Sequence, residues 1–430
     1  MTQSDVAEKL AIQGGSKAVI QDDPTLFKWP IVTSEDEQAV LDVLRAGTMS
    51  GIDITMKFED EFAAWQGAKH ALCCCNGTAA LLASMFGVGL GKGDEIIAPA
   101  MTYWASILPS LQLRASPVLA DIDPDTFCID PAGLEKRITP KTKAVVIVHQ
   151  FGHPCDMERI MPIIQKHKLK LIEDVSHAQG GYYKGRRLGS FGHVAAMSLM
   201  SAKSFAIGEG GILVTDDRLI YERATAFGHY QRTKPERNII TDPWLKQYEG
   251  MPLGGVKHRI NQTASAMGRV QLKYYDERCR EIRRAMNRFW DLLDGCPGIR
   301  AHRVDETDGS TMAGWYSPVG IYASEELGGL SSDDYAAAVK AEGAVCSSYG
   351  GNAGLLNIHG ILRSADIYND GKPTSIANSD RKTFCDPTDF PNANRFPSVC
   401  LNIPWFKRDD KTLIEQQAAA YRKVAGYYAK

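Results

Sequence analysis

The sequence lacks the features that mark several large classes of protein. Its 430 residues contain no basic run interleaved with aromatic residues, and the formal net charge is only −2, so nothing points to nucleic acid or an anionic membrane surface as a partner. No apolar stretch approaches the ~20 residues that a membrane-spanning helix requires. The N-terminal stretch MTQSDVAEKLAIQGG is polar and has no apolar segment typical of a secretory signal. These absences favour a cytoplasmic enzyme.

Paired cysteines are also absent. The chain has ten cysteines, three of them consecutive at Cys73, Cys74 and Cys75, but no Cys-x-x-Cys pair. Structural zinc sites and thioredoxin-type sites depend on such spacing. We therefore expect no metal site, and we interpret the cysteines as reduced, mostly small core residues.

A glycine-rich phosphate loop is missing as well, although one stretch resembles it at first sight. The stretch GVGLGKGDE does not match the GxxxxGK[ST] pattern, because Gly93 stands where that pattern has serine or threonine. It also ends a helical segment instead of beginning one. We interpret it as a turn between a helix and a strand.

The sequence does contain an alternation of short apolar runs and helical segments. Short, nearly continuous apolar runs are typical of strands buried on both faces of a parallel sheet, where ligands gather at the carboxyl ends of the strands. Ser34, with Glu37 three residues later, predicts a capping box at the start of the first helix. The expected strands are 95–100, 116–123, 144–151, 169–175, 194–200 and 211–217, separated by helical segments such as 77–86, 104–113 and 156–167.

Three parts are expected along the chain. Residues 1–33 show little periodicity and are interpreted as an N-terminal arm. A long helical pattern at 262–292 is expected to cross from one domain to another. The sequence therefore predicts a large domain at 34–290 and a smaller C-terminal domain at 291–430.

Two of the expected strand ends carry groups suited to a phosphorylated, planar ligand. In CNGTAALLASM, Gly77 and Thr78 begin a helix, where free N–H groups, a hydroxyl and the helix dipole favour a phosphate. The alternative there is an ordinary helix cap. In APAMTYWAS, Tyr103 and Trp104 follow a strand directly, so an aromatic face could cover a planar ring. The alternative there is a packed aromatic pair.

Two further strand ends carry charged groups. In LIEDVSHAQGG, Glu173, Asp174 and His177 close an apolar strand, where acids are costly unless they have a partner; the alternative is an aspartate that caps a helix. In SLMSAKSFAIGEGG, Lys203 follows an apolar strand and is either a solvated loop lysine or an amine in a dry site. Together these stretches offer a phosphate seat, an aromatic lid, a carboxylate and a lysine, which suit the cofactor pyridoxal phosphate (PLP). Proteins that bind PLP are known to pair a lysine with an aspartate on the ring nitrogen.

Several motifs give the chain a specific resemblance. They are NGTAAL, DEIIAPAMTY, DIDPDTFCIDP, VHQFGHPCDM, IEDVSHAQGGYYKGRRLGSFG and GEGGILVT, within a match that runs from WPIVTSEDEQAVLDVLRAG to CLNIPWF. The chain resembles the PLP-dependent sugar aminotransferases of the DegT/DnrJ/EryC1/StrS group. The resemblance implies an α/β fold of the aspartate aminotransferase type, which is PLP-dependent transferase type I, with a mostly parallel sheet in the large domain and a smaller α+β C-terminal domain.

The resemblance also implies a role for each candidate residue. Lys203 would form the Schiff base with the cofactor and move protons, and Asp174 would pair with the pyridinium nitrogen. His177 would lie near the phenolic oxygen of the cofactor, and Tyr103 would stack on its ring. The phosphate would be held by Gly77, Thr78, Ala79 and Ser198 and, across a homodimer interface, by Lys257 of the partner subunit.

Two positions depart from the family pattern. The stretch GVKHR places Lys257 where the family usually has asparagine, and a lysine there can still meet a phosphate as a point charge. Ser204 follows Lys203 where asparagine or another polar residue is common.

The reaction implied is transfer of an amino group from Glu or Gln to a keto-sugar or ketocyclitol in two half-reactions. The chain ends look most similar to scyllo-inosose aminotransferases. Residues 348–396 are loop-rich, and their Asn352, Asn357, His359 and Asn378 are expected to bind hydroxyl groups, unless the segment is a surface insertion with capping asparagines. The alternatives are a PLP-dependent dehydratase of the same family, where histidine often replaces the lysine, and a PLP-binding regulatory protein without turnover.

Overall fold

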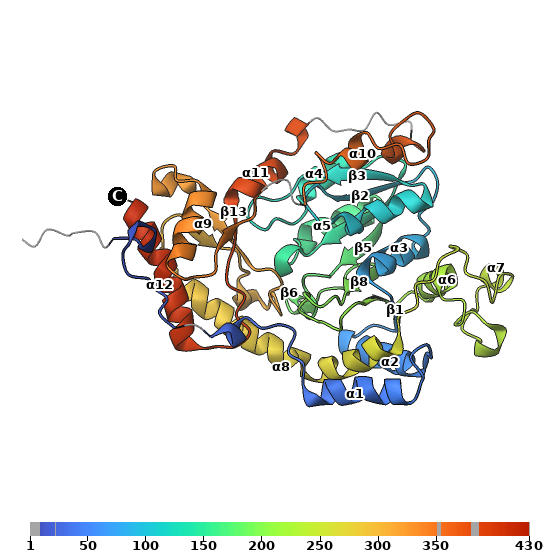
Figure 1. Cartoon of the computed structure of the whole chain (residues 1–430). Coiled ribbons are helices and arrows are strands. Elements are labelled where there is room, and N and C mark those ends of the chain that lie inside the picture. Colours follow the sequence, from blue (N-terminus) through green and yellow to red (C-terminus); the bar gives the residue numbers. More distant parts are fainter. Residues whose placement is uncertain (1–8, 22, 351–353, 380–386, 430) are drawn as a thin grey trace, which may run out of the picture.

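Two sheets organise the chain. A computed structural model describes residues 9–21, 23–350, 354–379 and 387–429 (Figure 1). The first sheet has seven strands: β1 (His70–Cys74), β2 (Glu95–Pro99), β3 (Ser116–Ala120), β4 (Thr142–Val148), β5 (Lys170–Asp174), β8 (Val194–Ser198) and β9 (Gly211–Thr215). The second has four: β10 (Ile299–Ala301), β11 (Val319–Tyr322), β12 (Ser347–Ser348) and β13 (Cys400–Asn402). A short ribbon pairs β6 (Tyr182–Tyr183) with β7 (Arg186–Arg187).

The seven-stranded sheet confirms the expected α/β fold. Its order is β1-β9-β8-β5-β4-β2-β3, and its strands pair in parallel except at β9, which is antiparallel to β1 and β8. All six expected strands form, with ends shifted by up to three residues. Strand β1 was not expected, because the pentapeptide HALCC contains none of the β-branched or aromatic residues that favour strands.

Helices cover both faces of this sheet. The α-helices of the described residues are α1 (Ser34–Arg45), α2 (Asp53–Gln66), α3 (Gly77–Gly87), α4 (Pro131–Arg137), α5 (Met157–Lys166), α6 (Arg218–Gly228), α7 (Pro243–Lys246), α8 (Gln262–Leu292), α9 (Ser332–Ala341), α10 (Gly360–Arg363), α11 (Pro391–Val399) and α12 (Lys411–Tyr428). Alternation along β2 shows the layering: Ile96 and Ala98 pack into the core beside α3, whereas Ile97 packs into the core beside α4 and α5. Across the described residues, no helix is both long enough and apolar enough to span a bilayer.

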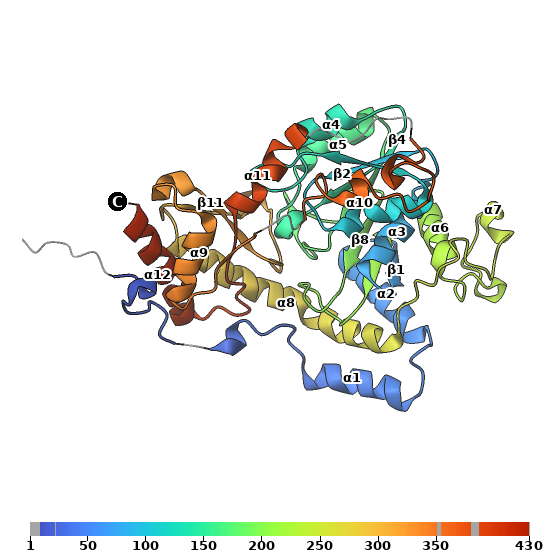
Figure 2. The ribbon, with the colours of Figure 1, turned by 45° about the horizontal axis from the view of Figure 1, so that its top comes forward.

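Helix α8 joins the two sheets. It is 31 residues long and runs from beneath the seven-stranded sheet to the four-stranded one (Figures 1 and 2). The second sheet is antiparallel and is packed with α9, α12 and the C-terminal half of α8. Leu10 and Leu26 of the N-terminal stretch lie in that same core, so this stretch crosses over to the C-terminal part of the chain. The domain limits 34–290 and 291–430 stay predictions.

The first helix begins as expected, but its capping box is displaced. Helix α1 starts at Ser34, yet the N-cap is Thr33, whose side chain accepts from the Asp36 N–H while the Asp36 carboxylate accepts from the Thr33 N–H. The assignment to Ser34 and Glu37 was therefore wrong by one residue. Threonine and serine are both good N-caps, and the extended backbone of Thr33 decided between them.

The helical segment expected at 104–113 is not one helix. It is split into two 3₁₀ helices, Trp104–Ser106 and Leu108–Leu113. Ile107 between them has a non-helical backbone, and Pro109 lacks the N–H that a continuous helix would need. The break sets the chain direction directly after Tyr103.

Candidate active site

Lys203 lies in a nearly dry site just beyond β8. A tight turn, closed by the Lys203 N–H donating to the Met200 carbonyl at 2.8 Å, returns the chain below the sheet edge. Only 8% of the lysine is exposed, and its Nζ lies 4.0 Å from the centre of the Tyr316 ring. Burial lowers the pKa of Lys203 to about 8, and the Asp174 carboxylate partly opposes that lowering. The structure therefore rejects a solvated loop lysine.

Asp174 is the last residue of β5 and is buried. Its Oδ2 accepts from the Ser106 hydroxyl at 2.8 Å, and its Oδ1 accepts from the Ser176 N–H at 3.1 Å. Turns follow β5 directly, so Asp174 does not cap a helix. Its electrostatic effect on Lys203 shows that the two predicted catalytic residues share one site.

Glu173, the neighbouring acid, has a different task. Adjacent residues of a strand point to opposite faces, so Glu173 turns away from Asp174. Its carboxylate accepts from the N–H groups of Gly189, Phe191 and Gly192 at 2.6–2.8 Å and pairs with His149 at 3.1 Å. Glu173 thus fixes the loop behind the sheet, which explains a buried acid without a catalytic role.

His177 is buried beside the same group. Burial, with a smaller contribution from the positive charge of Lys203, holds the pKa of His177 well below its usual range, so the ring is neutral. Its Nδ1 accepts from the Phe151 N–H at 3.3 Å, which leaves Nε2 as the protonated, donating nitrogen. The ring lies 4.6 Å from that of Tyr316, between centres.

The residues predicted to hold a phosphate lie at the start of α3. Gly77 and Thr78 are its first two residues, where the N–H groups have no acceptor within the helix. Ser198 lies directly opposite Gly77, at the end of β8. The Ala79 N–H, in contrast, donates to the Asn76 side chain at 2.8 Å, so the ordinary cap and the open N–H groups occur together at this terminus.

Gly77 is required by this close approach. A Cβ at position 77 would lie 2.7 Å from the Ser198 Cβ and 2.9 Å from its Cα. We expect Gly77→Ala to lower the free energy of unfolding by about 1–3 kcal/mol, the usual cost of overpacking, and to loosen the phosphate seat. Urea denaturation should show this, with Gly91→Ala as the control because a Cβ there meets nothing within 4 Å. Equal unfolding midpoints for the two variants would contradict the prediction.

Tyr103 and Trp104 lie at the carboxyl end of β2. Their rings are 5.0 Å apart between centres, and both are exposed, Tyr103 by 58%. Tyr103 also acts electrostatically on Tyr316, which places it at the mouth of the site around Lys203. The pair is therefore packed and still open to a ligand on its outer side.

A hydrogen-bonded chain connects Lys203 to the phosphate seat. Ser204 Oγ donates to Gln179 Oε1 at 2.9 Å, and Gln179 Nε2 donates to the Ser198 carbonyl at 2.7 Å. Ser204 also bonds with the hydroxyl of Tyr275 at 2.8 Å. Through Gln179, Ser204 therefore ties the turn that contains Lys203 to the end of β8, and this link requires a polar side chain at position 204.

Lys257 is exposed. Its neighbour His258 is buried and accepts, through its carbonyl, from the Cys75 N–H at 2.6 Å. This contact holds the GVKHR segment against the end of β1, close in sequence to Gly77. A role for Lys257 across a subunit interface stays a prediction.

The loop-rich segment contributes less to the site than expected. Asn357 donates to Asn394 at 2.7 Å, and His359 Nδ1 accepts from the Ile361 N–H at 3.2 Å and so caps α10. Asn378 is half-buried, and Asn352 lies outside the described residues. His359 thus fits the alternative of a capped insertion, although the backbone beside Asn357 pairs with the strand end that precedes Tyr103.

Four aromatic or charged residues at the site were not found from the sequence. Tyr316 touches both Lys203 and His177, and Trp29 Nε1 donates to the Lys203 carbonyl at 2.8 Å. Trp405 packs on Tyr316 and on Trp29, and Lys407 packs on Trp405. No sequence signal brings these together, because they come from the N-terminal stretch and from the C-terminal part of the chain.

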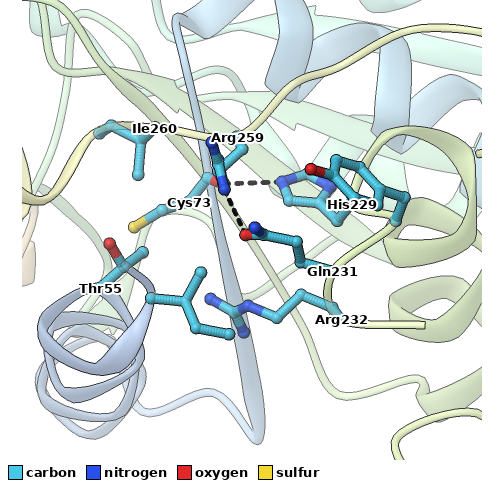
Figure 3. Close-up of a pocket in the computed structure, with 9 residues that line it drawn as sticks. Thr55, Cys73, His229, Gln231, Arg232, Arg259 and Ile260 are labelled. Carbon is cyan, nitrogen blue, oxygen red and sulfur yellow. Dashed lines mark hydrogen bonds between the residues drawn. The ribbon is translucent and has the colours of Figure 1, made fainter. Parts of the chain in front are cut away.

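A pocket beside Cys73 of β1 is lined by none of the residues predicted to bind the cofactor (Figure 3). In it His229 Nε2 bonds with the Cys73 carbonyl at 3.0 Å, Arg259 donates to Gln231, and Arg232 forms a buried ion pair with Glu59, outside the lining, at 2.8 Å. Burial lowers the pKa of His229 to about 3, so its ring is neutral. These partners give the pocket a structural role.

Comparison with known proteins gives consistent matches. The sequence profile of the DegT/DnrJ/EryC1/StrS aminotransferase family matches residues 30–350. The spore coat polysaccharide biosynthesis protein SpsC of Bacillus subtilis (strain 168) is 32% identical over 93% of this chain and 96% of its own length. The L-glutamine:2-deoxy-scyllo-inosose aminotransferase of Micromonospora echinospora is 32% identical over 79% of this chain and 82% of its own length. The crystal structure of an aminotransferase from Psychrobacter cryohalolentis superposes with a TM-score of 0.79, at 27% identity, covering 94% of this chain and 99% of that one.

Proposed function

Because the chain belongs to the DegT/DnrJ/EryC1/StrS aminotransferase family, we propose that its site transfers an amino group from Glu or Gln to a keto-sugar or a ketocyclitol. The family makes it a PLP-dependent aminotransferase. The observation that carries the proposal is the burial of Lys203 beside Asp174, at neighbouring strand ends of one sheet. The relative that acts on 2-deoxy-scyllo-inosose supports a polyhydroxylated ketone as the acceptor.

The residues present fit PLP. At the start of α3, two N–H groups have no acceptor within the helix, and Ser198 lies directly beside Gly77, so N–H groups and a hydroxyl suited to a phosphate come together there. We propose that Gly77, Thr78 and Ser198 hold the phosphate, and that Asp174 binds the ring nitrogen. When bound, PLP supplies an aldehyde that takes up the amino group and a protonated ring that withdraws electrons.

In this proposal, each residue of the site accepts, donates or orients a specific proton or hydrogen bond. With a pKa of about 8, the Lys203 Nζ would accept a proton and deliver it again within each half-reaction at little cost near neutral pH. Ser106 and the Ser176 N–H orient the Asp174 carboxylate. His177 donates from Nε2, and its neutral ring avoids a second positive charge beside Lys203.

The two alternatives are less well supported. A dehydratase of this family would be expected to carry histidine in place of Lys203, whereas this chain has the lysine in a dry site. A regulatory protein without turnover has no need to keep Lys203 at a pKa of about 8 beside Asp174. Turnover with an amino donor distinguishes a catalyst from a binding protein.

We also propose a homodimer in the cytoplasm. Leu41 and Leu44 on α1 are exposed by 40% and 46%, and Trp244 and Met251 on the projecting segment around α7 are exposed as well (Figure 1). Exposed apolar side chains of this kind are typical of surfaces that pair with a second copy of the chain. Lys257 of the partner subunit would then reach the phosphate.

The two halves of the proposal can be tested separately in single-turnover experiments. Glu or Gln alone should convert the aldehyde form of the bound cofactor to its amine form, which is visible in the absorption spectrum. Keto-sugars or ketocyclitols added afterwards should restore the aldehyde form, because a site built for hydroxyl groups discriminates against ligands without them. If only small aliphatic keto acids restore it, the sugar or cyclitol acceptor is wrong.

A further inference from the structure

Lys407 is a second buried lysine, and the proposed function leaves it without a task. It is 5% exposed, and its Nζ lies 2.7 Å from the ring centre of Trp405 and 5.2 Å from that of Trp29. Among residues 9–21, 23–350, 354–379 and 387–429, its Nζ has neither an ion pair nor a hydrogen bond. A buried ammonium group without an acid costs free energy, so its retention needs a reason.

The acids next to it are already used. Asp409 accepts from Arg288 at 2.6 and 2.9 Å, and Asp410 caps α12. Asp23, across the chain, pairs with Arg408. Burial therefore acts on Lys407 without compensation and lowers its pKa to about 5. With that pKa the free Lys407 amine is neutral near pH 7, and a negatively charged ligand would supply the missing partner by favouring the protonated form as it binds.

The rings around Lys407 are also the rings around Lys203. Trp29 donates its Nε1–H to the Lys203 carbonyl at 2.8 Å. The ring of Trp405 packs at right angles to the ring of Tyr316, with 5.9 Å between their centres. The Lys203 amine in turn lies over the Tyr316 ring. The Trp405 Nε1–H is fixed on the Gly314 carbonyl at 2.9 Å, so this aromatic wall is held rigidly. Shared aromatic rings therefore connect Lys407 with the candidate active site.

We propose that Lys407 is the residue that binds the carboxylate of the amino donor. The inference rests on the proposed function, in which the donor is Glu or Gln, and both carry an α-carboxylate. The phosphate of the cofactor is not the expected anion, because its proposed seat at Gly77 and Ser198 is formed by α3 and β8, whereas the Lys407 amine lies on the rings of Trp29 and Trp405. An ammonium group on apolar rings pairs best with a carboxylate that excludes water as it binds.

The test compares the holoenzyme with its Lys407→Met and Lys411→Met variants. Methionine matches the length of the lysine without its charge, and Lys411 is an exposed lysine of α12 that serves as the control. The probe is glutarate, which has carboxylates but no amine, measured against its neutral diamide by calorimetry. We expect Lys407→Met to weaken glutarate binding at least tenfold and to abolish the preference over the diamide, while Lys411→Met changes neither.

Steady-state kinetics and thermal unfolding complete the test. The KM for the donor should rise at least tenfold in Lys407→Met, with kcat and the KM for the acceptor changed by less than threefold. The melting temperature should not fall, because removing an unpaired buried amine relieves its cost. A lower melting temperature with an unchanged donor KM would show a structural lysine, and loss of the cofactor would show a phosphate ligand; either overturns the proposal.

The outcomes separate this inference from the proposed function. If the wild-type holoenzyme does not bind glutarate, or binds it equally well as Lys407→Met, Lys407 is not the carboxylate residue even when Glu or Gln is a donor. If glutarate binding depends on Lys407 but neither Glu nor Gln donates an amino group, the subsite stands and the proposed donor is wrong.

Discussion

Replacing Lys203 with alanine is expected to lower the transamination rate by about three orders of magnitude or more, because one amine both attacks the carbonyl and moves the proton. The site is built to keep this amine reactive. Burial holds the pKa of Lys203 at about 8, so a substantial neutral fraction is present near pH 8, and that fraction falls as the pH is lowered. An exposed lysine, with its higher pKa, would be almost entirely protonated at the same pH.

The measurement combines single-turnover rates with covalent trapping. Borohydride should fix the cofactor to a wild-type peptide that contains Lys203, and Lys203→Ala should give no such peptide. Lys92→Ala removes an exposed lysine and should behave as wild type. Trapping on a peptide that contains Lys407, the other buried lysine with a lowered pKa, would transfer the role to that residue.

Replacing Asp174 with asparagine is expected to lower kcat by about two orders of magnitude or more, the usual effect of losing a preorganised electrostatic partner. Asparagine has nearly the same shape: its one amide oxygen can accept from the Ser176 N–H, while its NH2 group can donate to the Ser106 hydroxyl oxygen. The fold should therefore survive, while the negative charge of the carboxylate, which the proposal places beside the ring nitrogen, is lost. Unfolding curves and the cofactor spectrum would show that the variant is folded and loaded.

Ser106→Ala is the matched control for this variant. It removes the 2.8 Å hydrogen bond to Asp174 but keeps the charge, so the rate should fall by about tenfold, the value of one hydrogen bond to a charged group. A kcat for Asp174→Asn within threefold of wild type would contradict the assigned role. An equal loss in the two variants would assign the effect to orientation of the carboxylate and not to its charge.

Local signals located the elements well wherever one pattern dominated. The six apolar runs became strands because each has enough apolar residues to be buried on both faces. The errors arose where competing local choices are nearly equal in energy. Thr33 and Ser34 are both suitable N-caps, HALCC has a weak strand preference, and the segment after Tyr103 is broken at Ile107.

The sequence by itself determined the strand-end positions of Lys203, Asp174 and Ser198, because parallel strands bring their carboxyl ends to one edge of the sheet, and it placed Gly77 at the start of a helix. The motifs around these residues then named the chemistry. The sequence did not show that Glu173 turns away from the site, which follows from strand alternation only once the register is known.

Only the tertiary structure decided what surrounds the lysine. Trp29 comes from the N-terminal stretch, and Tyr316, Trp405 and Lys407 come from segments beyond α8. Contacts between segments so far apart in sequence leave no local pattern, because they depend on how α8 brings the second sheet against the first. Burial lowers the pKa of both lysines, and the rings that lie on their amines, Tyr316 on Lys203 and Trp29 and Trp405 on Lys407, come from these distant segments.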